Sequence, residues 1–238
     1  MGPTPKRMKI DRKLPSALTL NITLSFLAGY VDAVGFMALF GLFTAHITGN
    51  LVLLGAELAT PEHTFPLLKI LAFPAFILGV ALATMIASAC EKKERNALII
   101  LYVVEMTFLM AFVLVGLVAG PIEENMSSAA ISAGIIGTLA MGVHSACGRL
   151  LLPDLAPTVM MTGNVTQLVV EFFQYLKEDS DKTRFGKCAK YLWPIIAFGI
   201  GSLIAAFAYL RFGFHALWLP IALVLILACI EAWNEIHG

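Results

Sequence analysis

The sequence has few charged residues and lacks the composition of a soluble protein. Only 13% of its 238 residues are charged, whereas 59% are hydrophobic and the mean hydropathy is +0.85. A soluble domain carries about 25% charged residues, and a fold with so few could not cover its surface with polar groups. The composition therefore places the chain in a lipid bilayer. It excludes a nucleic-acid binder, a secreted disulfide scaffold and a disordered regulator.

Motifs for catalysis and for metal or cofactor binding are also missing. The sequence contains no P-loop, nucleophile elbow, H-E-x-x-H or dinucleotide fingerprint. Four cysteines are present, but their spacing fits neither a disulfide framework nor a zinc or redox site: Cys90, Cys147, Cys188 and Cys229. We therefore expect no enzyme, no cofactor and no metal site. The net charge is zero, so only the distribution of charge along the chain is informative.

Hydrophobic runs predict several membrane-spanning helices. A helix needs roughly 20 apolar residues to cross the hydrocarbon layer. Six segments reach this length: 17–39, 67–90, 97–119, 128–148, 190–210 and 214–234. Two further apolar stretches, 44–59 and 158–175, are shorter, and each has a Thr-Gly-Asn triplet near its start. The chain therefore crosses the membrane six or eight times, depending on whether these two stretches cross.

The basic residues favour six crossings, because Lys and Arg collect in the short loops on the cytoplasmic side. If each short stretch enters and leaves on one side, fourteen of the sixteen Lys and Arg residues face the cytoplasm, leaving Lys69 and Arg211 outside. If both stretches cross, only eleven do. We predict an all-α polytopic protein of the inner cell membrane, with six transmembrane helices, two short re-entrant or broken helices and both termini in the cytoplasm. Residues 1–16 would form a basic cytoplasmic tail.

The two halves of the chain resemble each other. A shift of 114 residues aligns Thr48-Gly49-Asn50 with Thr162-Gly163-Asn164 and Glu57 with Glu171. This alignment divides the membrane region into repeats 17–120 and 121–238. With three full spans each, the second repeat starts on the opposite side of the membrane, which is the three-plus-three inverted repeat of many transporters. We expect the two triplets to meet near the middle of the bilayer.

The triplets are candidate binding elements for a small polar or anionic solute. Glycine lets the chain turn, threonine can cap the helix that follows, and asparagine both donates and accepts hydrogen bonds. A helix that begins inside the membrane presents free N–H groups and a partial positive charge. The predicted solute-binding residues are Thr48, Gly49, Asn50, Thr162, Gly163 and Asn164. The alternative is that both triplets only hold helices together.

Several ionisable residues are candidates for an ion or proton pathway. Asp32 and Glu105 lie inside long apolar spans, where an acid is costly and is a functional candidate by default. Asp32 has no acidic counterpart, because the 114-residue shift places Ala146 there. A structural hydrogen bond between helices is the alternative for both acids. Two further acids, Glu57 and Glu171, are either gates of the pathway or solvated residues at the membrane surface. Two histidines, His46 and His144, either shuttle protons or serve only in packing.

Four sequence stretches resemble the YoaK-like family of bacterial membrane proteins of unknown function. The stretches are residues 28–36, AGYVDAVGF, and 43–50, FTAHITGN, in the first half, with 141–146, MGVHSA, and 157–164, PTVMMTGN, in the second. The similarity covers nearly the whole chain beyond the basic tail. Cys147 departs from the pattern, which has a polar amide there in many relatives. The resemblance implies a polytopic inner-membrane protein with six spans, and it supplies neither an activity nor a substrate.

These observations favour a transporter or channel for a small solute, with proton coupling through the buried acids. The alternative is a membrane module that does not transport, such as a lipid-binding, sensory or scaffold protein. For the protein as a whole, the predicted partners are the lipid bilayer and the unidentified solute. A homodimer with a second copy of the chain is also plausible for a protein with only six spans.

Overall fold

The computed structural model describes residues 17–60, 66–119, 127–177 and 182–237. This part of the chain is helical and contains no strand. Its elements are α1 (Ala17–Ala38), α2 (Ile47–Ala59), α3 (Pro66–Lys92), α4 (Ala97–Ala119), α5 (Ser128–Leu151), α6 (Met161–Lys177), α7 (Lys182–Phe212), the short 3-10 helix η1 (Gly213–Leu217) and α8 (Trp218–His237). The predicted tail 1–16 lies outside the described residues, as do the connections 61–65, 120–126 and 178–181.

Within the described residues, five helical segments are long and apolar enough to cross a membrane. Four of them are single helices, namely α1, α3, α4 and α5. The fifth, Gly186–His237, has 52 residues and runs through α7, η1 and α8. A straight helix rises about 1.5 Å per residue and would be far longer than the hydrocarbon is thick. The chain turns at η1, where Gly213 has a φ of 55°, a conformation that suits glycine.

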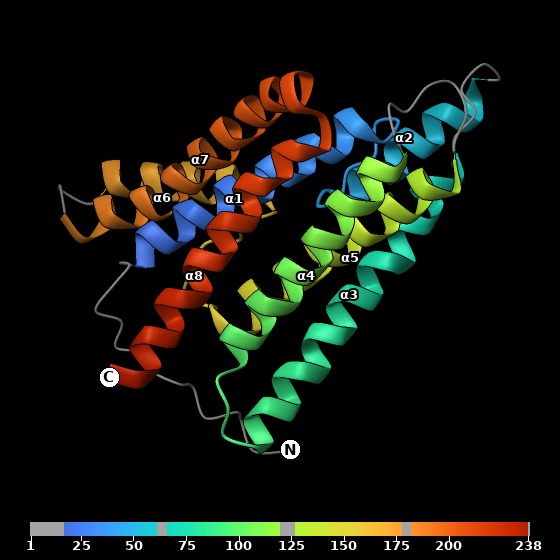
Figure 1. Ribbon diagram of the computed structural model, residues 1–238. Helices are drawn as coiled ribbons and strands as arrows, with labels where there is room; N and C mark the ends of the chain where they lie inside the picture. Colours follow the sequence, from blue (N-terminus) through green and yellow to red (C-terminus); the bar gives the residue numbers. More distant parts are fainter. Residues whose placement is uncertain (1–16, 61–65, 120–126, 178–181, 238) are drawn as a thin grey trace, which may run out of the picture.

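The two short helices lie at opposite ends of the helix bundle, as Figure 1 shows. Helix α2 packs against α3, and α6 packs against α7. No residue of α2 contacts α6 in the described part of the chain. The expectation that the two Thr-Gly-Asn triplets meet near the middle of the membrane is therefore wrong, because each short helix is held at its own end by the long helix that follows it.

Close crossings between long helices organise the bundle. Helix α1 packs along α7, and α3 packs along α5. Each crossing depends on glycine, since a Cβ atom on Gly29 would lie 2.2 Å from the carbonyl oxygen of Phe198, and one on Gly79 would lie 2.4 Å from that of Leu139. At the first crossing the Ser202 hydroxyl donates to the Gly29 carbonyl at 3.0 Å. Small residues allow this approach, which is a common basis of helix association in membranes.

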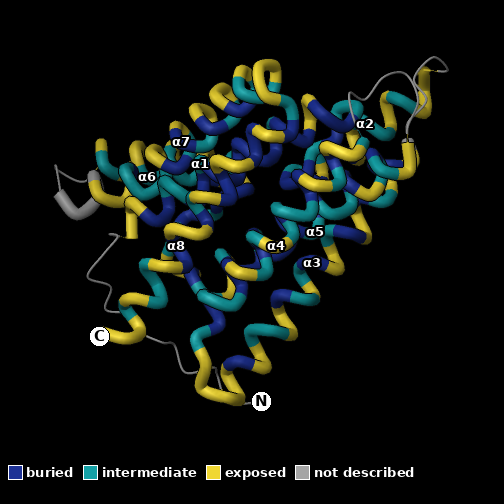
Figure 2. Tube along the Cα trace, viewed as in Figure 1, coloured by how far each residue is buried: buried dark blue, intermediate teal, exposed yellow. Residues whose placement is uncertain are grey.

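Polar side chains are enclosed between these helices, while apolar side chains cover much of the outside. Figure 2 shows the buried residues gathered along the inner faces and the exposed residues along the outer faces and at the helix ends. The buried polar residues of the described chain are Asn21, Ser25, Asp32, Thr44, Asn50, Lys69, Glu105, Thr138, His144, Thr158 and Asn164. Burial of a charged or polar group away from water is unfavourable unless the group is paired. The functional candidates are therefore found by asking which of these groups contact each other.

Candidate functional site

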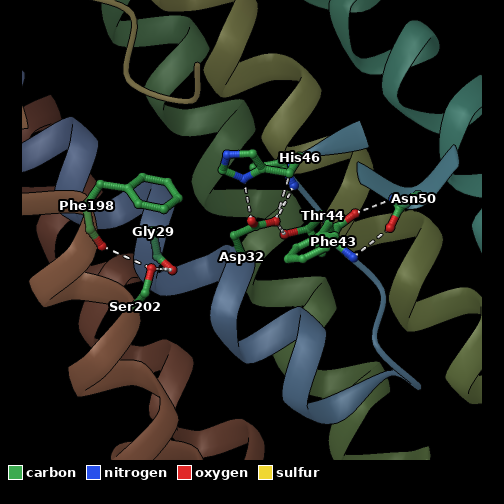
Figure 3. Close-up of polar contacts among 9 residues, drawn as sticks. Gly29, Asp32, Phe43, Thr44, His46, Asn50, Phe198 and Ser202 are labelled. Carbon is green, nitrogen blue, oxygen red and sulfur yellow. Dashed lines mark hydrogen bonds and ion pairs between the residues drawn. The ribbon is translucent and has the colours of Figure 1, made fainter. Parts of the chain in front are cut away.

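Asp32 holds together the connection between α1 and α2. Its side chain is buried on α1, and its Oδ1 atom accepts hydrogen bonds from the Ala45 N–H at 2.6 Å and, at 3.4 Å each, from the Thr44 hydroxyl and the His46 N–H. The other oxygen, Oδ2, lies 2.7 Å from Nδ1 of His46 (Figure 3). The carboxylate therefore serves as an anion inside a pocket of backbone and side-chain donors, and it fixes the start of α2.

His46 is the more accessible member of this pair. Its side chain is 34% exposed, whereas that of Asp32 is 5% exposed. The hydrogen bond to Asp32 raises the pKa of the His46 imidazole, and partial burial opposes this rise. The ring packs edge-on against Phe198 of α7 at a centroid distance of 5.3 Å. His46 therefore connects α2, α1 and α7, and its charge state bears on all three.

A second acid–histidine pair lies between α4 and α5 and is completely buried. Nδ1 of His144 lies 2.9 Å from Oε1 of Glu105, and the two side chains are 2% and 1% exposed. Nε2 of His144 lies 3.0 Å from the Thr158 hydroxyl, in the connection between α5 and α6. The second carboxylate oxygen of Glu105 is buried and has no hydrogen-bond partner among the described residues. The three side chains form a continuous chain of protonatable and hydroxyl groups.

Asn50 and Asn164 fasten the loops that precede their own helices. The Asn50 amide donates to the Phe43 carbonyl at 2.7 Å and accepts from the Phe43 N–H at 2.9 Å (Figure 3). The Asn164 amide donates to the Pro157 carbonyl at 2.7 Å. Phe43 and Pro157 correspond under the 114-residue shift, so the two halves use the same contact.

The remaining triplet residues lie at the starts of α2 and α6. These helices begin at Ile47 and Met161, so Thr48 and Thr162 are already in the first turn and are exposed. The prediction that these threonines cap the helices is wrong, because each helix begins one residue earlier. Gly163 is also exposed, and Gly49 is half-buried. Their role in solute binding remains a prediction.

Glu57 has a basic partner that sequence reasoning did not assign. Lys69 of α3 is 2% exposed, and its Nζ lies 2.6 Å from Oε1 of Glu57 and 2.8 Å from the Phe40 carbonyl. The charge count treated Lys69 only as a residue outside the cytoplasm. Its position within an apolar run was the signal for a buried functional or structural charge. Glu171, the counterpart of Glu57, accepts from the Gln167 amide at 3.0 Å.

A cavity of about 100 Å³ lies under the connection between α5 and α6. Ser145 and Arg149 of α5 line it together with Thr158, Val159 and Met160. The guanidinium of Arg149 donates to the sulfur of Met160 at 3.2 Å, a weak acceptor.

Asn21 of α1 closes this connection from the other side. With its amide oriented to satisfy both partners, Asn21 donates to the Ala156 carbonyl and accepts from the Ala156 N–H, each at 3.0 Å. Asn21, Thr44, Thr158 and Arg149 were not selected from the sequence as site residues. Their polar side chains in or beside the predicted motifs were the available sign of a site, but the sequence does not show which groups these side chains contact.

The comparisons with known proteins agree with a membrane protein of this kind. The sequence pattern of the family described as "Protein of unknown function (DUF1275)" matches residues 20–230. The chain belongs to this family. It is 28% identical over 222 residues to the UPF0700 transmembrane protein YoaK of Bacillus subtilis (strain 168), covering 87% of this chain and 90% of that protein. No solved structure matches. The chain is thus a multi-pass transmembrane protein, and the resemblance drawn from its motifs is confirmed.

Metal ligands do not gather in the part of the chain that the structure describes. No group of three or more His, Cys, Asp and Glu side chains there could hold a metal ion. The groups that the candidate site offers are two carboxylate–imidazole pairs, two threonine hydroxyls, a guanidinium and the backbone N–H groups at the starts of α2 and α6.

Proposed function

We propose that this protein moves a small polar or anionic solute across the membrane and couples this movement to protons. The observation that carries the proposal is the Glu105–His144–Thr158 chain, which is enclosed between α4, α5 and the connection to α6. Removing two ionisable groups from water costs several kcal/mol per charge, and their attraction offsets this only with good geometry and further hydrogen bonds. Ionisable groups inside membrane bundles accordingly mark ion and proton pathways. No enzymatic step is part of the proposal.

The architecture we propose is a three-plus-three inverted repeat with six crossings. In this arrangement α1, α3, α4, α5, α7 and α8 cross, and α2 and α6 return to the side from which they start. Three observations support it. The pairing of α1 with α7 has its counterpart in that of α5 with α3, α2 and α6 lie at opposite ends of the bundle, and the Asn50–Phe43 contact recurs as Asn164–Pro157.

Proton flux in liposomes tests the transport proposal. Purified protein is reconstituted in vesicles that contain a pH-sensitive dye, and potassium nitrate, formate, bicarbonate or phosphate is added outside. We expect one of these salts to drive a change of internal pH that Glu105→Gln abolishes. Glu91→Gln, which changes an exposed acid at the end of α3, is the matched control and should keep the flux. Flux equal to that of protein-free vesicles with all four salts would contradict the proposal.

Cysteine accessibility tests the number of crossings. In a variant lacking all four native cysteines, single cysteines are placed at positions 62, 93, 125 and 180. Labelling of 93 and 180 from the cytoplasm and of 62 and 125 from outside is expected for six crossings. Labelling of 62 and 125 from the cytoplasm and of 93 from outside would mean that the two short helices cross as well, and the repeat would be parallel.

A membrane module that does not transport is the second candidate, and the asparagine contacts favour it. Asn50 and Asn164 use their amides to fasten their own loops, which is a structural role. For this candidate, Asn50→Leu would lower the stability of the protein and leave no effect of the solute to be lost. Thermal unfolding of the wild type and this variant with each of the four salts separates the two candidates.

A further inference from the structure

The two halves of the chain differ at one position that decides where an anion sits. In the first half, the carboxylate of Asp32 is the common acceptor for the Thr44 hydroxyl and for the N–H groups of Ala45 and His46. A shift of 114 residues places Thr158, Val159 and Met160 at the positions of these three donors and Ala146 at that of Asp32. The second half therefore has the corresponding donors without the carboxylate.

Two of these donors, the backbone N–H groups, have no partner where the carboxylate is missing, whereas the Thr158 hydroxyl contacts His144. In the described part of the chain, the N–H groups of Val159 and Met160 make no hydrogen bond to an acceptor; Val159 is buried at 7% exposed, and Met160 is 55% exposed. Buried backbone N–H groups in proteins are nearly always paired, with protein or with another bound group. Both residues line the cavity of about 100 Å³. The unpaired donors thus lie at a space that a ligand can occupy.

The charges around the cavity favour an anion. The Arg149 guanidinium lines it and contacts Met160, the residue before α6, so a fixed positive charge lies next to the positive end of a helix dipole. Ser145 and Thr158 bring hydroxyl groups. No carboxylate from the described residues lines the cavity. Since a water molecule takes about 30 Å³ in the liquid, the space fits an ion of a few heavy atoms.

We propose that this cavity binds a small oxyanion, in the place that the Asp32 carboxylate takes in the first half of the chain. Arg149 supplies the charge that balances the anion. The N–H groups of Val159 and Met160 and the Thr158 hydroxyl donate to its oxygens. The inference rests on the proposed function only in taking this anion as the transported solute.

The hydrogen bond between Thr158 and His144 couples anion binding to protonation. When His144 is neutral and its Nδ1–H donates to Glu105, Nε2 accepts from the Thr158 hydroxyl, whose proton is then turned away from the anion. When His144 is an imidazolium, Nε2–H donates to Thr158, and the hydroxyl proton is free to donate to the anion. The bound anion therefore favours the protonated imidazole, and by linkage the anion binds more tightly as the pH falls.

Charged groups inside the helices that pack against α5 have partners of their own, and Asp154, in the connection after α5, is exposed. Of the helices that pack against α5, α4 contributes Glu105, the acid already in this chain. Helix α3 carries Lys69, which is bound to Glu57, and α1 carries Asp32, which is bound to His46. Arg149 is on α5 itself and remains positively charged throughout the accessible pH range. His144 and Glu105 are therefore the groups to which the pH dependence is assigned.

Thermal unfolding in nanodiscs of zwitterionic lipid tests the site. The probes are nitrate, formate, bicarbonate and phosphate, added to a HEPES buffer whose anion is larger than the cavity. A ligand that binds the folded state raises the unfolding temperature by mass action, which yields an apparent Kd. We expect one probe to stabilise the wild type, and Arg149→Gln to weaken its binding by about tenfold to a hundredfold, the effect of losing a charged hydrogen bond. Arg211→Gln, at an exposed arginine of α7, should leave the Kd unchanged.

Ala146→Asp provides the missing carboxylate and is the sharpest variant. We expect it to unfold at a higher temperature than the wild type without added salt, and to lose the response to the probe. His144→Gln should retain binding but lose its dependence on pH. If Ala146→Asp does not fold, the comparison of Arg149→Gln with its control Arg211→Gln still tests whether the cavity binds an oxyanion. An equal response in the wild type and Arg149→Gln, or no response to any probe in any lipid, would overturn the proposal.

The same oxyanion chemistry is present in a free ion and in a lipid phosphate. Nanodiscs of phosphatidylglycerol separate the two, because a headgroup in the cavity would stabilise the protein without added salt and block the probe, and Ala146→Asp would remove both effects. Either result supports the oxyanion site and shows whether the bound group is a free ion or a lipid phosphate. Binding without proton flux in the liposome assay would overturn the transport proposal and leave this site intact. Proton flux without binding of any probe would overturn the oxyanion site and leave the transport proposal intact.

Discussion

Nδ1 of His144 lies 2.9 Å from Oε1 of Glu105, although the two residues are 39 positions apart in the chain and belong to different helices. Neither side chain has access to solvent, since both are 2% exposed or less. A lone charge at this position would be unfavourable, so each residue accounts for the presence of the other. The pair therefore has to be tested as a unit.

Removing one partner of this pair should destabilise the protein more than replacing both. His144→Leu leaves the Glu105 carboxyl buried without its imidazole, and we expect a loss of about 3–5 kcal/mol in the free energy of unfolding. The double variant His144→Leu with Glu105→Leu has no buried ionisable group here and should recover part of that loss. Unfolding of the purified variants in detergent measures both. A double variant as unstable as the sum of the two single changes would show that the residues act independently.

Lys69→Met should destabilise the contact between α2 and α3. Lys69 is buried and donates to Glu57 and to the Phe40 carbonyl, and Phe40 is held at a φ of 52°. Its loss leaves a partly buried carboxylate without a counterion, so we expect a loss of about 3 kcal/mol or more. Lys92→Met, at an exposed lysine at the end of the same helix, should change stability by less than about 0.5 kcal/mol. Comparable losses in the two variants would rule out a special role for Lys69.

The stability of the protein should depend on pH through His46. The hydrogen bond to Asp32 raises the pKa of His46, so the folded state favours the protonated imidazole. This contribution is fully present below the unfolded pKa of about 6.5 and is lost as the pH rises through the higher folded pKa. His46→Gln should flatten this part of the curve of unfolding temperature against pH. Because the His46 side chain is 34% exposed, solvent screening makes the effect modest. An unchanged slope in His46→Gln would assign the dependence to another group.

The hydrophobic pattern was sufficient to locate the long helices but not all of their bounds, since α7 begins at Lys182, eight residues before the predicted segment 190–210. The predicted segments 17–39, 97–119 and 128–148 correspond to α1, α4 and α5 within three residues at either end. Hydropathy works here because backbone groups in lipid must pair within their own segment, which makes length and apolarity the dominant constraints. The 114-residue shift also located both short helices, since a glycine and an asparagine at the same spacing leave a clear pattern.

The partners of the buried polar groups could not be predicted in the same way. Asp32 and Glu105 were identified as intramembrane acids, but their contacts with His46 and His144 depend on how the helices are rotated and offset. Such rotation is set by packing contacts, for example that of Gly29 with Phe198, and not by average hydropathy. The positions of the two triplets were misjudged for a related reason. Three spans per half predict opposite entry sides but say nothing about how far each short helix reaches.

Two neighbouring glycines of α7 should respond in opposite ways to alanine. A Cβ atom on Gly201 would lie 2.3 Å from the carbonyl oxygen of Phe26, so Gly201→Ala forces α1 and α7 apart and should cost about 1–3 kcal/mol. A Cβ atom on Gly199 would have nothing within 4 Å, so Gly199→Ala should be neutral or stabilise the helix by up to about 1 kcal/mol. Unfolding temperatures of the two variants check this, and equal shifts would mean that the two helices do not cross as closely as described.

Asn50→Ala should destabilise the protein more than Asn164→Ala, although a shift of 114 residues places the two at equivalent positions. Asn50 exchanges two hydrogen bonds with Phe43, whereas Pro157 has no N–H to donate and receives a single bond from Asn164. Asn50→Ala leaves both an N–H and a carbonyl of Phe43 without their partner, at a cost of about 1–3 kcal/mol for each buried group. Denaturant unfolding of both variants measures the difference. Equal losses would mean that the Asn50–Phe43 N–H bond contributes little. A larger loss for Asn164→Ala would indicate that Asn164 has a role beyond its loop, as the predicted solute site requires.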